Sequence, residues 1–146
     1  EFTVFRFFNT YGPKQSKTFV ISKFIHAAVK NVDIEIYGDG MQTRTFCFID
    51  DNIEATTNAF YKNLFIDDVV NIGSDIEMTI LDLAKAIIKL TGSKSKIVHL
   101  PPLPEGDMTR RQPDATKMKK LLNRNFLSLE DGLKKILADT RFILKD

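Results

Sequence analysis

The chain has 146 residues, of which 43% are hydrophobic and 27% charged, with a formal net charge of +2. That is the balance of one modest globular domain, spanning residues 1–146. The small charge gives no electrostatic case for nucleic acid, and no apolar run approaches the roughly 20 residues of a membrane span. The single cysteine, Cys47, permits no internal disulfide. It lies in an apolar run, so we expect a small buried hydrophobe in a reducing, cytoplasmic protein.

The chain opens on a predicted strand and an amphipathic helix. Residues 2–8 are rich in Phe and Val, and a strand with two apolar faces usually lies inside a sheet. Residues 9–15 contain Gly12-Pro13 and predict a loop. Residues 18–30 carry apolar side chains at i and i+4 spacing, which predicts a helix with one buried face.

A glycine turn between two short β-type runs predicts a hairpin. Residues 34–37 precede Gly38-Asp39-Gly40, and residues 44–49 follow it. The glycines allow a tight reversal with positive φ. The reversal leaves Arg44 at the start of the returning strand, where its guanidinium can point into a groove. A guanidinium can donate two hydrogen bonds to one phosphate, although a solvated hairpin explains the same residues equally well.

Capping signals place the helices in the rest of the chain. A side chain that accepts a backbone N–H starts a helix, and a glycine in the left-handed region ends one. The predicted helices are one capped by Asp50 or Asp51 and running to about Lys62, one over 80–91 between the Thr79/Asp82 pair and Gly92, a Lys-rich helix after Asp114, and a last helix after the Ser128/Asp131 pair. Short strands are expected at 69–72 and 97–100, and the long loop 101–113 is a candidate functional loop.

These elements mix helices and short strands without a regular β-α-β alternation. We therefore expect an α/β fold, of mixed α+β type as an isolated fragment. It would be an α+β domain or the second lobe of a larger α/β enzyme.

Three further residues are candidates for a binding site. Asn9 follows the first strand, and ligands of α/β sheets bind outside the carboxyl ends of strands; alternatively, it is a turn asparagine that bonds its own backbone. The Tyr37 ring could stack on a flat base. Arg111 lies shortly before a helix start and could be a second anion clamp, or a surface arginine paired with Asp107 or Asp114.

Metal and serine-nucleophile chemistry find no support in the sequence. Neither His26 nor His99 has a Cys, Asp or Glu at metal-ligand spacing, so no metal site is expected. The chain also has no Gly-x-Ser-x-Gly elbow.

Four segments in fixed order resemble one known family. They are Arg6–Pro13, Ile36–Asp51, Val70–Gly73 and Arg111–Asp114. Together they resemble the C-terminal half of the NAD-dependent epimerase/dehydratase family, the extended short-chain dehydrogenase/reductases that act on nucleotide sugars. That family includes UDP-glucose 4-epimerases, UDP-glucuronate decarboxylases and dTDP-glucose 4,6-dehydratases.

The resemblance implies a role for each candidate residue. Asn9 would contact the sugar diphosphate, Ile36 and Tyr37 would lie against the nucleotide base, and Arg44 and Arg111 would hold the phosphates. Residues 1–146 would be the small substrate-binding lobe of such an enzyme, and the ligand would be a UDP-sugar or a related nucleotide sugar.

Two departures from the family pattern bear on the reaction. Lys14 stands where the family often has an arginine, which in decarboxylases is linked to binding the sugar carboxylate. A lysine keeps the charge but cannot donate two parallel hydrogen bonds, so decarboxylation is less well supported. Asn123–Phe126 replaces a usual Gly-Trp-x-Pro, which we expect to affect packing more than chemistry. The leading interpretation is a UDP-sugar 4-epimerase, with a decarboxylase or 4,6-dehydratase as alternatives.

The family's cofactor loop and catalytic pair are missing from the sequence. No Gly-rich dinucleotide turn follows a strand, and no tyrosine has a lysine four residues later: Tyr11, Tyr37 and Tyr61 are followed there by Gln15, Met41 and Phe65. We therefore expect no catalytic residue, no turnover and no NAD binding from residues 1–146 alone. In the intact enzyme, NAD, an N-terminal Rossmann part and a homodimeric partner are expected. A non-catalytic binding module is the second hypothesis.

Overall fold

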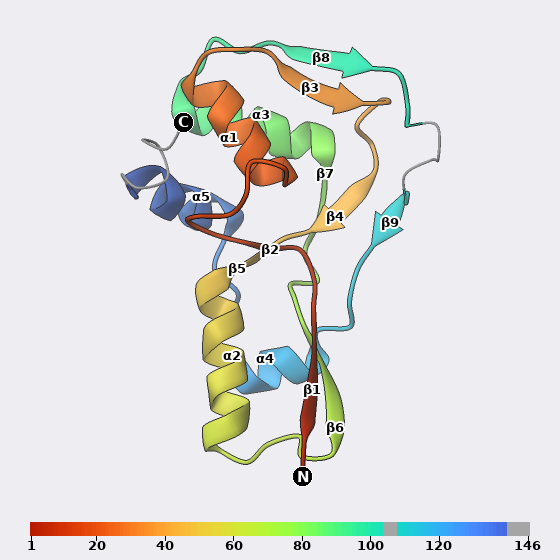
Figure 1. Ribbon diagram of the computed structural model, residues 1–146, viewed down its shortest axis with the longest axis vertical. Coiled ribbons are helices and arrows are strands. Elements are labelled where there is room, and N and C mark those ends of the chain that lie inside the picture. The colour runs from red at the N-terminus through yellow and green to blue at the C-terminus, as the bar shows by residue number, and fades with distance from the viewer. Residues whose placement is uncertain (104–107, 140–146) are drawn as a thin grey trace.

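The computed structural model describes residues 1–103 and 108–139, which form an elongated α/β body (Figure 1). Its elements, in chain order, are β1 (Thr3–Phe7), β2 (Thr10–Tyr11), α1 (Val20–Val29), β3 (Ile34–Tyr37), β4 (Thr43–Thr45), β5 (Cys47–Phe48), α2 (Ile49–Tyr61), β6 (Asp68–Ile72), β7 (Glu77–Thr79), α3 (Ile80–Thr91), β8 (Ile97–Leu100), β9 (Arg110–Arg111), α4 (Thr116–Leu122) and α5 (Leu129–Ala138). The strands pair in four small sheets with the orders β1-β6, β2-β5, β3-β8 and β7-β4-β9. The expected mixed α/β class is confirmed.

Two apolar cores lie at opposite ends of the body. The larger one joins α1, α3 and α5 beneath β3 and β8, and Phe24 and Leu83 are among its fully buried members (Figure 1). The smaller one joins α2, α4 and β6, and Met118 and Val70 are buried in it. The short parallel pair β2-β5 connects the two ends. Residues that follow β1 and β5 therefore lie at the junction between the two cores.

The first strand exists as predicted, but its burial does not match. β1 pairs in parallel with β6, from Thr3 opposite Asp68 to Phe7 opposite Ile72. The expectation that both faces are covered is wrong, because Val4 and Phe7 are 44% and 57% exposed. Among the described residues β6 is the only strand paired with β1, so one edge and most of one face have no protein packed against them.

The predicted capping is confirmed for two helices and wrong for a third. The Thr79 hydroxyl accepts the Asp82 N–H and Gly92 ends α3 in the left-handed region, while Ser128 caps α5. In α2, by contrast, the N-cap residue is Phe48 and no side chain caps it. Asp51 lies in the first turn instead, where a carboxylate still favours the helix dipole, and accepts the Leu127 N–H at 2.9 Å.

The glycine turn is confirmed and the hairpin is wrong. Gly38 and Gly40 adopt positive φ values of 69° and 75°. However, β3 pairs in parallel with β8, while β4 pairs with β7 and β9. The carbonyl of Gly40 accepts the N–H of Leu81. This hydrogen bond attaches the turn to the start of α3, and β4 continues away from β3.

The predicted loop after β1 contains the short strand β2, which is held by close aromatic packing. Tyr11 is 2% exposed and meets Phe48 edge to face, with ring centroids 5.3 Å apart. Its hydroxyl lies against Gly132 of α5, where an added Cβ would overlap the Tyr11 oxygen. Gly132 therefore allows α5 to approach β2 closely, and this contact fixes the path of the chain just after Asn9.

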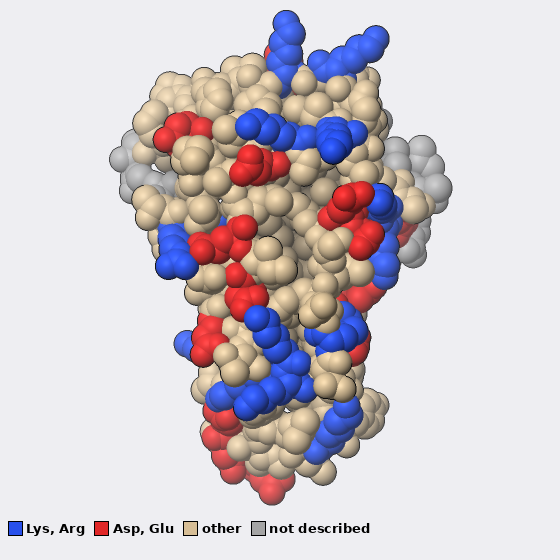
Figure 2. All heavy atoms as spheres, turned by 180° about the vertical axis from the view of Figure 1, so that it is seen from behind, with Lys and Arg blue, Asp and Glu red and all other residues tan. Residues whose placement is uncertain are grey.

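Charge is intermixed on the surface drawn in Figure 2, which shows Lys and Arg lying beside Asp and Glu. The Lys-rich helix α4 contributes to this pattern, since Lys117 pairs with Asp68 and Lys119 with Asp75. Among the described residues, no helix has the length and apolar character needed to cross a bilayer.

Candidate functional site

Two arginines far apart in sequence are direct neighbours in the sheet β7-β4-β9. Arg44 of β4 lies opposite Arg111 of β9 in a parallel register. Paired residues in neighbouring strands project to the same face, so the two guanidinium groups start from adjacent positions on one side of the sheet. Arg44 Nη1 also donates to the carbonyl of Met108 at 2.7 Å, which links β4 to the segment entering β9. The structure thus brings together the two cationic candidates that the sequence named separately.

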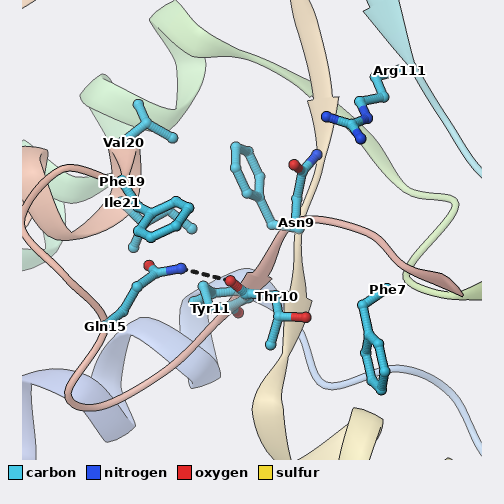
Figure 3. A pocket seen from close by; sticks show the side chains of 10 residues that line it. Phe7, Asn9, Thr10, Tyr11, Gln15, Phe19, Val20, Ile21 and Arg111 are labelled. Atoms are coloured by element: carbon cyan, nitrogen blue, oxygen red, sulfur yellow. Dashed lines mark hydrogen bonds between the residues drawn. The ribbon is translucent and has the colours of Figure 1, made fainter. Parts of the chain in front are cut away.

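Asn9 lies beside this arginine pair at the junction between the two cores. It adopts a left-handed φ of 36°, which asparagine tolerates better than most residues, and its carbonyl accepts the N–H of Cys47. Its Nδ2 is buried and has no hydrogen-bond partner among the described residues. Figure 3 shows the Asn9 amide directed toward the Arg111 guanidinium. Because both groups offer donors toward the space between them, that space suits an anion.

Two pockets meet at Asn9. The first holds about 300 Å³ and is lined by Arg111 and by residues of the β1-to-α1 segment, including Thr10, Gln15 and Phe19 (Figure 3). The second holds about 320 Å³ and is lined by Arg44, Tyr37 and Lys23 among others. Both include Asn9, Val20 and Phe46 in their walls. The two spaces are therefore adjacent halves of one groove, with Asn9 between them and an arginine on each side.

Tyr37 and Ile36 have different positions in this groove. The two faces of β3 alternate, so Ile36 is 1% exposed in the core while Tyr37 is 43% exposed. Both line the second pocket. Of these two residues, Tyr37 presents an accessible aromatic ring, whereas Ile36 is buried beneath the pocket. The two residues are therefore not equivalent contacts for a base, because their side chains project from opposite faces of the strand.

Glu77 holds the arginine-bearing strands together, a role that the sequence did not reveal. Its carboxylate accepts Arg110 Nε and Nη2 at 2.8 and 2.9 Å, and Thr43 donates to it at 2.9 Å. The bond from Arg110, with a smaller contribution from Thr43, lowers the pKa of Glu77. One residue of β7 thus bridges β4 and β9. No strand was predicted around Glu77. The sequence signal that could have indicated β7 is the alternation of Glu77 and Thr79 with Met78 between them.

Arg111 lies against an aromatic ring, and among the described residues it forms no ion pair with Asp114. Its guanidinium lies 5.9 Å from the centroid of the Phe8 ring, within cation-π range. Asp114 instead accepts the N–H of Thr116 at the start of α4. The other suggested partner, Asp107, lies outside the described residues. The Phe8 ring therefore supports the Arg111 side chain where it lines the first pocket beside Asn9 (Figure 3).

The remaining polar candidates do not form a reactive centre. Burial raises the pKa of the Cys47 thiol to about 12, so Cys47 is the inert buried residue that was expected. Burial, followed by the charges of Cys47, Asp51 and Asp131, also raises the pKa of Tyr11 well above its usual range. Among the described residues no cluster of His, Cys, Asp or Glu could hold a metal. Lys14 is exposed and lines neither half of the groove.

Comparison with known proteins finds one matching family model and several similar enzymes. The family model described as "NAD dependent epimerase/dehydratase family" matches residues 1–73. UDP-N-acetyl-alpha-D-glucosaminuronate decarboxylase of Bacillus cytotoxicus is 39% identical over 153 residues, covering 99% of this chain and 47% of that protein. UDP-glucuronic acid decarboxylase 1 of Danio rerio is 36% identical over 140 residues, covering 94% of this chain and 33% of that protein.

The solved structures that superpose on this chain include two epimerases. The crystal structure of UDP-glucose 4-epimerase with UDP-glucose from Thermotoga maritima superposes with a TM-score of 0.84 at 30% identity, covering 98% of this chain and 47% of that one. UDP-glucuronic acid 4-epimerase from Bacillus cereus, in complex with UDP-glucuronic acid and NAD, gives a TM-score of 0.80 at 32% identity, covering 91% and 43%. The chain spans less than half the length of each of these relatives.

Proposed function

The chain belongs to the NAD-dependent epimerase/dehydratase family, and on that premise we propose that its groove binds the nucleoside diphosphate part of a UDP-sugar. The observation that carries the proposal is the strand register that sets Arg44 opposite Arg111, with Asn9 in the wall of the pocket beside each of them. Their donors come from three segments of the chain.

The diphosphate is assigned to the space between the two arginines. Guanidinium groups donate two parallel hydrogen bonds to a phosphate, and bonds to charged groups are about twice as strong as neutral ones. The unpartnered Nδ2 of Asn9 gains its missing acceptor from the same anion. A buried donor without a partner costs about 1–3 kcal/mol, which a phosphate oxygen would remove.

The base and the sugar are assigned to the two halves of the groove. Tyr37 offers an exposed ring, and a base stacked on an aromatic side chain is stabilised by about 1–3 kcal/mol. That places the base in the half lined by Arg44 and Tyr37. The sugar then lies beyond Asn9, beside the polar side chains of Thr10 and Gln15.

The described residues do not fit the family's dinucleotide cofactor. A dinucleotide site requires a glycine-rich turn that joins a strand to a helix N-terminus. The left-handed glycines of the described chain are Gly38 and Gly40, which join β3 to β4, and Gly92, which ends α3. We therefore assign substrate binding, and no hydride-transfer step, to these residues.

For the whole enzyme we propose 4-epimerisation of a UDP-sugar as the leading activity, supported by the epimerase structures that superpose on this chain. Decarboxylation of a UDP-hexuronate is the second candidate, because the two curated relatives described above are decarboxylases. Incubation of the complete enzyme with UDP-glucuronate separates them. Epimerisation yields the 4-epimer with the carboxylate retained, whereas decarboxylation releases carbon dioxide.

Titration calorimetry with UDP tests the binding proposal on this chain. We expect Arg44→Ala and Arg111→Ala each to weaken UDP binding by about tenfold or more, the loss of a charged hydrogen bond. Arg6→Ala is the matched control, since Arg6 is exposed on β1, bonds Asn71 and lines neither half of the groove. If UDP does not bind, or if the three variants bind it like the wild type, the proposal is wrong.

A further inference from the structure

An ion pair lies beside the aromatic ring in the second half of the groove. Lys23 of α1 approaches Glu35 of β3, with Nζ 3.2 Å from Oε2. The same ammonium lies 5.8 Å from the centroid of the Tyr37 ring. Both partners line the half of the groove that contains Tyr37 and Arg44. The pair is about half exposed, so its contribution to stability is small, at about 0–1 kcal/mol.

The fold determines which partner donates and which accepts. Glu35 and Tyr37 project from the same face of β3, because residues two apart in a strand share a face. Lys23 comes from α1, and its ammonium reaches both Glu35 and the Tyr37 ring. An ammonium has three donors and no acceptor, and a carboxylate only accepts. A flat ring placed against Tyr37 therefore meets a donor from the α1 side and an acceptor from the β3 side.

We propose that Lys23 and Glu35 read the edge of the pyrimidine base and select uracil over cytosine. The inference rests on the proposed function, which places the base on Tyr37 and the diphosphate at Arg44. The edge of uracil farthest from the ribose carries the O4 acceptor and, next to it, the N3–H donor. Lys23 donates to O4, and Glu35 accepts from N3–H.

Cytosine presents the opposite order at the same two positions. Its exocyclic N4 amine is a donor where uracil has the O4 acceptor, and its N3 is an acceptor. The ammonium of Lys23 would then face a donor, and the carboxylate of Glu35 would face a lone pair. Each mismatch leaves a charged group without its partner, so the wrong base loses two hydrogen bonds. The sugar and phosphate contacts are the same for both nucleotides.

The charge-swapped variant Lys23→Glu/Glu35→Lys gives the decisive experiment. It keeps the ion pair and reverses the order of donor and acceptor. By calorimetry we expect the wild type to bind UDP more tightly than CDP by about tenfold or more, since two charged hydrogen bonds are lost with CDP and the loss of one is already about tenfold. The swapped variant should prefer CDP, and Lys23→Met/Glu35→Gln, which removes both charges, should bind the two nucleotides within about threefold of each other.

The outcomes separate this inference from the proposed function. If UDP binding depends on Arg44 but the preference for UDP over CDP is the same in the swapped variant, the inference is wrong and the diphosphate site stands. If UDP does not bind the wild type, both are wrong. Thermal melting of the swapped variant within a few degrees of the wild type confirms that its fold is intact. If the swapped variant melts far lower, Lys23→Met/Glu35→Gln decides the question, because a preference for UDP as strong as that of the wild type would then show that the inference is wrong.

Discussion

Gly132→Ala tests the packing that holds the chain in place after Asn9. The new Cβ would overlap the hydroxyl oxygen of Tyr11 and lie 2.8 Å from its Cζ, well inside van der Waals contact. The ring cannot slide away easily, because Phe46 and Phe48 meet it edge to face at 6.5 and 5.3 Å. Overpacking of this kind costs about 1–3 kcal/mol. The helix itself gains about 1 kcal/mol from alanine in place of glycine.

The balance of these terms predicts a loss of stability. With the overlap at the severe end of the range, we expect the free energy of unfolding to fall by about 2 kcal/mol. Urea denaturation followed by circular dichroism should show a lower midpoint with an unchanged slope. Tyr11→Phe provides the control, because its hydroxyl is buried without a partner among the described residues and its removal alone should be nearly neutral.

The double variant makes the reasoning refutable. Tyr11→Phe with Gly132→Ala removes the overlap with the hydroxyl oxygen but keeps the contact with Cζ, so it should recover part of the lost stability. The two effects should therefore be non-additive, as is usual for residues in contact. If Gly132→Ala is as stable as the wild type, or if the two substitutions add, α5 does not press on Tyr11 as described.

The remaining predictions concern the arginine strands and the buried hydroxyl and thiol. Glu77→Gln should weaken UDP binding about threefold in calorimetry while the wild-type fold is retained, because Arg110 and β9 lose their charged anchor; unchanged affinity would show that Glu77 does not position the site. Since the folded-state pKa of Glu77 is lowered, its contribution is present at neutral pH and is lost as the pH falls through that pKa. The folded-state pKa values of Cys47 and Tyr11 are raised, so the unfolded chain loses these protons at a lower pH than the folded protein does. Their contribution to the free energy of unfolding is therefore fully present below the unfolded pKa values and is lost as the pH rises above about 9. The urea midpoint should therefore fall between pH 9 and about 11, and a flat profile there would contradict the burial of both groups.

Local signals in the sequence were sufficient for the helices but not for the pairing of strands. The Thr79/Asp82 pair and Gly92 act within one or two turns of α3, so their effect could be predicted without knowing the rest of the fold. The hairpin failed because the partner of β3 is β8, about 60 residues later, and competition between distant strands leaves no local trace. The burial of β1 failed for a related reason, since apolar composition indicates which residues prefer to be covered but not what covers them.

The site shows the same division. Asn9 follows β1, Tyr37 ends β3 and Arg44 lies in the short strand β4, and these positions together with the side-chain chemistry made each of them a candidate. Their convergence depends on the register that sets Arg44 opposite Arg111, and that register depends on Glu77. Lys23 and Glu35 gave no signal at all, because a lysine beside an apolar helix stripe and a glutamate in a strand look like ordinary solvated residues.

The side-by-side placement of Arg44 and Arg111 has a thermodynamic consequence. Two like charges on adjacent strands repel each other, and the strands that carry them have only three and two residues. An anion between the guanidinium groups removes that repulsion, so the groove and its ligand are energetically linked. A ligand at one hundred times its dissociation constant stabilises the folded state by about 2.7 kcal/mol. Part of the stability of this sheet would then come from the substrate. Inorganic pyrophosphate, which has neither a base nor a sugar, should therefore raise the melting temperature of this protein by itself.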